Sequence, residues 1–267
     1  MSPEHAAALL AAVEQSPRLV ALHQREAWCG LYAQDGAIND PVGSAPHLGH
    51  AAIGRFYDTF IAPNHIRFHV EHDVAWGNTV VRDLIVETRM LGGIQMLVPM
   101  HLRYELVEEG GALKIQRLGA HWELPAMIRQ LLGKGLGGLR VSMALGARMV
   151  RCLGLGGVLG FVRGFAGVGS AGKRTAHAFF EAAEDGKTEV AAALLAPGCR
   201  LESPYGTELT TEVFLAGLGD VRIGKMLASG PVVSVTLFTA AGRGVAFLRF
   251  DMQGRIAAAE VFVSAAA

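Results

Sequence analysis

The stretch NDPVGSAPHLGHAAIGRFY, residues 39–57, decides how the N-terminal half of this chain is interpreted. Asp40 precedes a proline and a glycine, which together indicate a tight turn. The residues after the turn carry apolar side chains at helical spacing, namely Ile53, Phe56, Tyr57 and Phe60. Two interpretations of Asp40 follow: a turn residue that caps its own backbone, or an acid at an apolar pocket that takes a proton from a ligand.

Around this stretch, the first 123 residues are typical of helices followed by strands. Residues 27–32 form a helical run that leads through AQDG into AIND, and residues 51–60 form an amphipathic helix. Asn78 and two Gly-Gly pairs then separate four segments rich in β-branched and aromatic residues: IRFHVEHDVAW, TVVRDLIVETRML, IQMLVPMHLRYELV and LKIQRLGAHWEL. Helices before an antiparallel meander predict the α+β class.

The last third of the chain repeats this plan. RTAHAFFEAAEDGKTEVAAALLAPGCRLESPYG resembles RLVALHQREAWCGLYAQDGAINDPVG in periodicity, and Ser203 then stands where Asp40 stands in the first half. VAFLRFDMQGRIAAAEVFV likewise resembles the last two strands of the first half, with a short Gly-containing turn. We therefore predict two tandem domains of one fold, residues 1–123 and 173–267, joined by a helical linker of residues 124–172.

The charge of the chain is unevenly distributed. Lys and Arg together number 24, as do Asp and Glu, so the net charge is zero. Residues 124–174 nevertheless contain no acid and eight cations: Arg129, Lys134, Arg140, Arg148, Arg151, Arg163, Lys173 and Arg174. This glycine-rich apolar segment predicts helices packed between the domains, or an interfacial helix that makes peripheral contact with an anionic membrane. The arginines within it argue against a helix that crosses a bilayer.

Several functional classes are disfavoured. Cys29, Cys152 and Cys199 lie far apart and match no metal spacing, so we expect buried thiols in a soluble, cytoplasmic protein. The N-terminus opens with Glu4 and His5, unlike a signal peptide.

Metal and cofactor binding are also disfavoured. Strand alternation separates His65, His69 and His72, so we expect no metal. The linker glycines lack the strand and lysine of a phosphate-binding loop, and the basic segment has few aromatic residues, so we expect no cofactor and no nucleic acid.

Residues 31–57 carry a resemblance to a known enzyme family. LYAQDGAINDPVGSAPHLGHAAIGRFY, residues 31–57, resembles the corresponding region of bacterial Δ5-3-ketosteroid isomerases. These belong to the nuclear transport factor 2-like superfamily, with limonene epoxide hydrolase and the SnoaL-type polyketide cyclases. The resemblance covers residues 18–123 and, more faintly, 175–264. It implies two cone-shaped domains, each a curved antiparallel sheet wrapped by helices around an apolar pocket. It also implies pairing of domains within the chain or as a homodimer.

The resemblance assigns roles to particular residues. Asp40 corresponds to the general base, which removes a proton beside a ketone and returns it two carbons along. Tyr32 and Tyr57 fall where tyrosines brace the oxyanion donor, and Trp122 falls where an aromatic residue packs near the base. Phe60, Met100 and Leu102 complete the expected substrate-binding set. For the tyrosines and the tryptophan, plain core packing is an equally good interpretation.

The chain also departs from the family. The oxyanion tyrosine falls at Ser16, and the second donor falls near Leu102, while alternation turns His101 to the other face of its strand. In the second half Ser203 replaces the base, and Ala246 and Phe247 replace the acid.

Three functions therefore stay open. The first is an isomerase that acts on a steroid-like or isoprenoid substrate. The second is a non-catalytic binding or carrier protein for a hydrophobic small molecule. The third is a structural protein that only mediates association.

Overall fold

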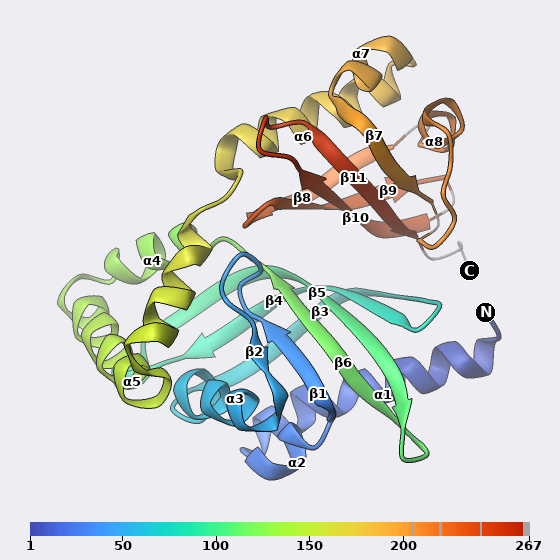
Figure 1. Cartoon of the computed structure of the whole chain (residues 1–267). Coiled ribbons are helices and arrows are strands. Elements are labelled where there is room, and N and C mark those ends of the chain that lie inside the picture. Colours follow the sequence, from blue (N-terminus) through green and yellow to red (C-terminus); the bar gives the residue numbers. More distant parts are fainter. Residues whose placement is uncertain (204, 219–220, 241, 264–267) are drawn as a thin grey trace.

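The computed structural model describes residues 1–203, 205–218, 221–240 and 242–263. It confirms the predicted fold class, a mixed α+β protein with two separate sheets, each wrapped by helices and joined through helices (Figure 1). The domain boundaries at residues 123 and 173 stay a prediction, and residues 264–267 lie outside the described part.

The first domain is built on a six-stranded sheet of order β2-β1-β6-β5-β4-β3. Its helices are α1 (Pro3–Ala21), α2 (Arg25–Cys29), α3 (Gly49–Phe56), the π-helical turn η1 (Tyr57–Ile61) and the short η2 (Leu91–Gly93). Its strands are β1 (Tyr32–Asn39), β2 (His47–Leu48), β3 (His65–Trp76), β4 (Thr79–Arg89), β5 (Gln95–Glu109) and β6 (Ala112–His121). The four predicted meander strands correspond to β3–β6.

The predicted helical run at residues 27–32 is wrong in its extent. Helix α2 ends at Cys29, and the AQDG sequence lies within strand β1 rather than in a turn. β1 pairs with β6 in parallel, with a register shift between Tyr32 and Ala37, so the sheet is not wholly antiparallel as predicted. The AQDG residues fall within this shift and have no register partners on β6, so β1 bulges there.

The second domain repeats the first with one strand fewer. Its helices are α6 (Gly169–Glu184), α7 (Thr188–Ala193) and α8 (Thr211–Gly217). Its strands are β7 (Leu195–Glu202), β8 (Arg222–Ser229), β9 (Val232–Thr239), β10 (Gly242–Phe250) and β11 (Ile256–Val263), in the order β7-β11-β10-β9-β8. β7 runs parallel to β11, as β1 runs parallel to β6. The internal repeat seen in the sequence thus corresponds to a repeat of topology.

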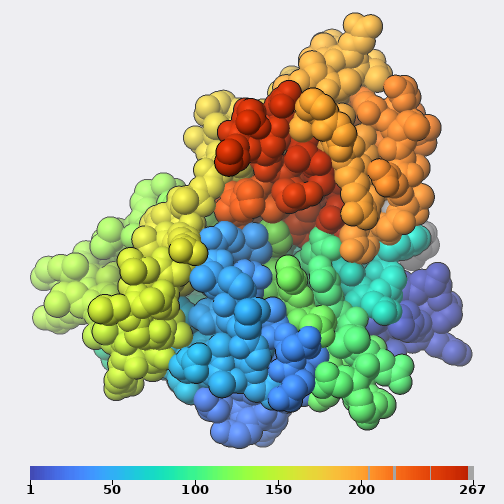
Figure 2. Space-filling model, viewed as in Figure 1, coloured from blue at the N-terminus to red at the C-terminus, as the bar shows by residue number. Residues whose placement is uncertain are grey.

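The linker consists of α4 (Leu124–Leu132), α5 (Gly135–Val162) and the short η3 (Arg163–Phe165). Helix α5 is kinked at Gly154, where φ is +69°. These helices lie beside the first domain and form a lobe at one side of the molecule, rather than packing between the two sheets as one interpretation of the sequence predicted (Figures 1 and 2). Cys152 in α5, and Cys199, are partly exposed, which corrects the expectation of three buried thiols.

The two sheets contact each other directly. Val74 and Val81 of the first sheet form one buried cluster with Val245, Phe247 and Phe262 of the second. Strand β5 divides its side chains between two environments because neighbouring residues of a strand point to opposite faces. Its even-numbered residues around Leu102 face the interior of the first domain, and its odd-numbered residues face the second domain.

Candidate functional site

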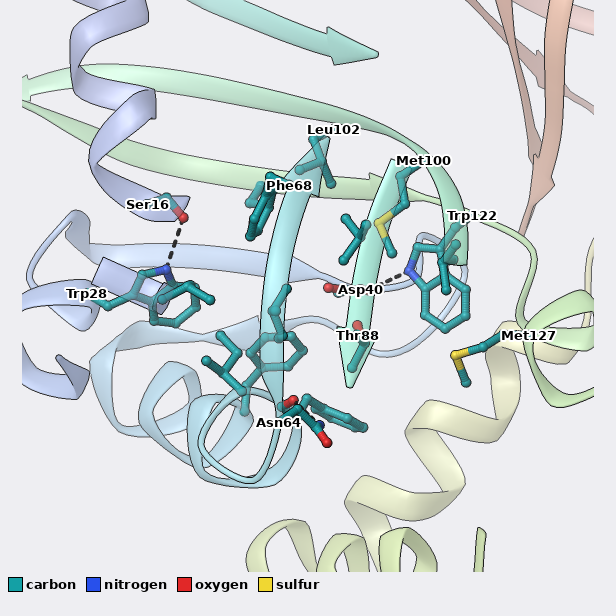
Figure 3. Close-up of a pocket in the computed structure, with 18 of the residues that line it drawn as sticks. Ser16, Trp28, Asp40, Asn64, Phe68, Thr88, Met100, Leu102, Trp122 and Met127 are labelled. Atoms are coloured by element: carbon teal, nitrogen blue, oxygen red, sulfur yellow. Dashed lines mark hydrogen bonds between the residues drawn. The ribbon is translucent and has the colours of Figure 1, made fainter. Parts of the chain in front are cut away.

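A cavity of about 150 Å³ lies in the first domain, between the inner face of the sheet and helices α1, α3 and η1 (Figure 3). Its walls are mainly apolar, with Phe56, Phe68 and Met100 among them, and α4 and α5 contribute Met127, Leu145 and Phe161 at one end. The polar residues on its walls are Ser16, Asp40, Asn64, Thr88 and Tyr104. A mostly apolar cavity with a few polar groups is typical of a small-molecule site.

Asp40 follows directly after strand β1 and presents its carboxylate to this cavity. Its Oδ1 accepts a hydrogen bond of 2.6 Å from the indole Nε1 of Trp122 (Figure 3). Burial raises the pKa of Asp40 to about 6, although the Trp122 hydrogen bond acts in the opposite direction. A carboxyl with this pKa is ionised at neutral pH and is still a useful base.

The turn after Asp40 does not depend on the Asp40 carboxylate. The Val42 amide donates to the carbonyl of Ala120 at 2.8 Å, and the Ser44 hydroxyl donates to the carbonyl of Pro41 at 2.7 Å. The Asp40–Pro41 peptide bond is cis. Within the described residues, the carboxylate accepts no bond from a backbone amide, so the geometry favours the pocket interpretation of Asp40 over the capping one.

The second domain braces the same turn from outside. The Ser229 hydroxyl donates to the carbonyl of Val42 at 2.8 Å. Gly43 has a φ of +99°, and a Cβ built on it would lie 2.5 Å from the Cα of Gly230. Only glycine allows this conformation and this approach at low cost.

The sequence analysis missed three polar cavity residues, Asn64, Thr88 and Tyr104, of which Tyr104 carries a phenol hydroxyl. Ser16 lies on the same cavity wall, and its Oγ accepts a 3.0 Å bond from the Trp28 indole. Burial raises the pKa of Tyr104 to about 12, so the phenol keeps its proton and can donate. The available signal was strand alternation, because Tyr104 shares its face of β5 with Leu102.

The predicted binding residues divide into two groups. Phe60, Met100, Leu102 and Trp122 lie on the cavity wall together with Asp40. Tyr32 and Tyr57 lie behind the wall instead, where their rings pack against Trp28 with centroids 5.1 and 5.4 Å from it. Both hydroxyls are buried and have no hydrogen-bond partner among the described residues. These two tyrosines are therefore core residues, not part of the cavity wall.

A second buried polar cluster lies between the sheets. His101 donates to or accepts from Ser234 Oγ at 2.8 Å and Thr236 Oγ1 at 2.9 Å, and Thr236 donates to Asp83 at 2.7 Å. Lys225 and Arg243 also pair with Asp83. His101 is 0% exposed and Asp83 1%, so the cluster joins the domains and is closed to a substrate.

Two histidines of β3 form hydrogen bonds with other residues of the protein. His69 is hydrogen-bonded to Glu87 at 2.9 Å, and His72 to the carbonyl of Arg243 at 3.1 Å. Within the described ranges, no group of three or more His, Cys, Asp or Glu side chains is placed to hold a metal ion.

The second domain has no counterpart of Asp40. Ser203 occupies that position, and the neighbouring Glu202 is 1% exposed and accepts a 2.7 Å bond from the Gly206 amide. Phe179, Phe180 and Phe214 pack in the interior of this domain. Pro204 in the same turn lies outside the described residues.

The chain is similar to known proteins over part of its length. Residues 8–103 match the nuclear transport factor 2 (NTF2) domain family. A Delta 5-3-ketosteroid isomerase from Mycobacterium sp. is 31% identical, and the match covers 45% of this chain and 95% of that chain, with a TM-score of 0.41. A Mycobacterium tuberculosis protein solved in complex with estradiol-17beta-hemisuccinate is 29% identical over 43% of this chain and 94% of its own, with a TM-score of 0.40.

A computationally designed 17-OHP binder is also similar. It is 26% identical, and the match covers 43% of this chain and 93% of that chain, with a TM-score of 0.40. No curated protein matches the chain.

Proposed function

This chain belongs to the nuclear transport factor 2-like superfamily through its first domain, and we propose that this domain binds a steroid-like or isoprenoid molecule and shifts a double bond in it. The observation that carries the proposal is Asp40, a carboxyl of raised pKa on an apolar cavity wall, held by Trp122. The 31% identical relative is by its name a ketosteroid isomerase, which favours the same reaction class here.

The reaction assigns each group one task. The Asp40 carboxylate removes a proton from the carbon between the ketone and the isolated double bond, and the electrons of that C–H bond move onto the ketone oxygen through a dienolate. The protonated Asp40 then returns the proton two carbons further along. The dienolate electrons form the conjugated double bond, and the ketone is restored.

The developing negative charge on the ketone oxygen needs a donor. Ser16 and Leu102 stand where the family resemblance places its two donors, and a leucine side chain cannot donate. The Tyr104 hydroxyl, which lies on the cavity wall with Ser16 and keeps its proton, is the donor that we assign in their place. Removing one well-placed donor costs about 10²–10³-fold in rate.

An ultraviolet assay of conversion of a Δ5-3-ketosteroid to its conjugated isomer tests the proposal. We expect turnover by the wild type, its loss in Asp40→Asn, and a fall of about 10²–10³-fold in Tyr104→Phe. The matched control Tyr205→Phe removes a hydroxyl outside the cavity and should leave the rate unchanged. Equal turnover by wild type and Asp40→Asn would refute Asp40 as the base.

A second candidate function, a carrier for an apolar ligand, is favoured by the same cavity. Leu102 stands where the second donor of the family is expected, and helices α4 and α5 close one end of the cavity. Trp28 and Trp122 line the cavity, so their fluorescence reports occupancy. Saturable quenching by a steroid, equal in wild type and Asp40→Asn and without turnover in either, would select the carrier over the isomerase.

A further inference from the structure

Helix α5 is apolar on two opposite faces. One face carries Val141, Leu145 and Met149, which pack toward the first domain or line its cavity. The opposite face carries a stripe of four exposed apolar side chains, Leu136, Leu139, Met143 and Val150, with exposures of 76%, 48%, 68% and 47%. Their spacing of three, four and seven residues aligns them along one side of the helix.

The exposed apolar surface continues beyond the kink at Gly154. Leu155 and Leu159 are 72% and 68% exposed, and Val162 and Phe165 follow at 47% and 48%. By length and composition the segment Gly135–Phe165 could cross a membrane, contrary to the expectation from its arginines. Only 11% of its 18-residue apolar window is buried inside the protein. A core helix of this composition would be mostly buried, so packing within the described chain does not account for it.

The charges around this stripe are of one sign. Residues 124–174 carry eight cations and no acid, and in the part of the chain that the structure describes only Lys173 forms an ion pair, with Glu123. Arg140 and Arg151 are exposed and directly follow Leu139 and Val150 of the stripe. The apolar band is thus bordered by cations that have no acidic partner.

We propose that this linker surface, the exposed apolar side chains of α5 and η3 with their bordering arginines, docks on an anionic lipid bilayer. The apolar stripe would enter the boundary between headgroups and acyl chains, and the arginines would contact lipid phosphates. A second copy of this chain is a poorer occupant, because two acid-free segments of eight cations each would repel one another.

The position of the cavity gives this docking a consequence. Leu145 and Phe161 of the same helix form part of the cavity wall, so a docked α5 would bring the end of the cavity next to the lipid. The inference that an apolar ligand passes between the bilayer and the cavity rests on the proposed function. The inference that α5 docks on the bilayer does not.

Flotation of the full-length protein with vesicles tests the proposal. We expect the wild type to float with phosphatidylcholine vesicles that contain phosphatidylglycerol, to float less in high salt, and to remain unbound with phosphatidylcholine alone. Leu136→Glu with Met143→Glu, and Arg140→Glu with Arg151→Glu, should each weaken binding by about tenfold or more. All four side chains are exposed in α5, so the variants should melt like the wild type.

Matched controls separate the surface from general effects. Met252→Glu changes a 97% exposed apolar residue of the second domain, and Arg18→Glu with Arg67→Glu reverses two exposed cations outside the linker. Both controls should float like the wild type. Asp40→Asn should also float normally, because docking does not require the cavity carboxylate.

Three results would overturn the proposal. The first is no flotation of the wild type with anionic vesicles, and the second is an equal loss in the linker variants and the controls. The third is a concentration-dependent oligomer in analytical ultracentrifugation that Leu136→Glu with Met143→Glu abolishes while flotation is absent. That last result would make the surface a contact between copies of the chain.

Discussion

Gly43 and Gly230 touch across the two domains so closely that a Cβ on either residue would lie 2.5 Å from the Cα of the other. Gly43 belongs to the turn that follows Asp40, and Gly230 connects β8 to β9 of the second domain. The second domain therefore fixes the backbone beside the proposed base. It does so although it has Ser203, and not an acid, at the position of Asp40.

Gly230→Ala should separate the domains locally and destabilise the protein by about 1–3 kcal/mol, because a methyl group has no space there. Gly110→Ala is the matched control, since Gly110 has a φ of +61° against +54° for Gly230 but an added Cβ would meet nothing within 4 Å. Urea unfolding should show a larger loss for Gly230→Ala. Equal losses would mean that backbone conformation, rather than contact with Gly43, is the cause.

Asp40→Asn should stabilise the protein at pH 8. The folded-state pKa of Asp40 is raised from 3.8 to about 6, so the folded state binds more protons than the unfolded state between these values and stability falls as pH rises. Removing the buried charge should therefore add up to roughly 3 kcal/mol above pH 6 and nothing below about pH 4. Urea unfolding at several pH values measures the gain, and a gain that does not vary with pH would contradict the raised pKa.

The rate of the proposed isomerisation should rise with pH through about 6, since only the ionised Asp40 accepts a proton. The pH profile of kcat/KM in the free enzyme reports this pKa directly. Trp122→Phe removes the hydrogen bond that favours the charged form, so the midpoint should move to higher pH. A midpoint that stays in place would show that the indole does not act on the carboxylate.

His121 should make the protein sensitive to mild acid. Burial lowers its folded-state pKa to about 3, with nearby His101 and Arg103 acting in the same direction. Between pH 6.5 and 3 the unfolded state therefore binds the extra proton, and stability falls as pH falls. His121→Leu should remove roughly 4 kcal/mol of this loss at pH 3.

Phe161 should control access to the cavity. Its ring stacks on Phe60 with centroids 5.4 Å apart, and both residues line the cavity. Phe161→Ala should speed both binding and release of an apolar fluorescent probe, measured by stopped flow, because it opens the wall formed by α5. Phe165→Ala, at a 48% exposed neighbour, is the control. Equal rates in all three proteins would place the entrance elsewhere.

The sequence alone was sufficient for features that depend on local periodicity. Alternation in β5 placed Leu102 on the cavity face and His101 on the opposite face. The repeat of the strand pattern predicted the second domain. Each of these follows from residues close together in the chain, where side-chain direction has a fixed period.

Tertiary structure decided the rest. Strand β1 exists because it pairs with β6 in parallel, about 80 residues further along the chain. The packing of α5 against the cavity rather than between the sheets joins distant segments, and so does the contact of Gly43 with Gly230. No local pattern encodes such contacts, because they depend on how whole elements pack once their own apolar faces are buried.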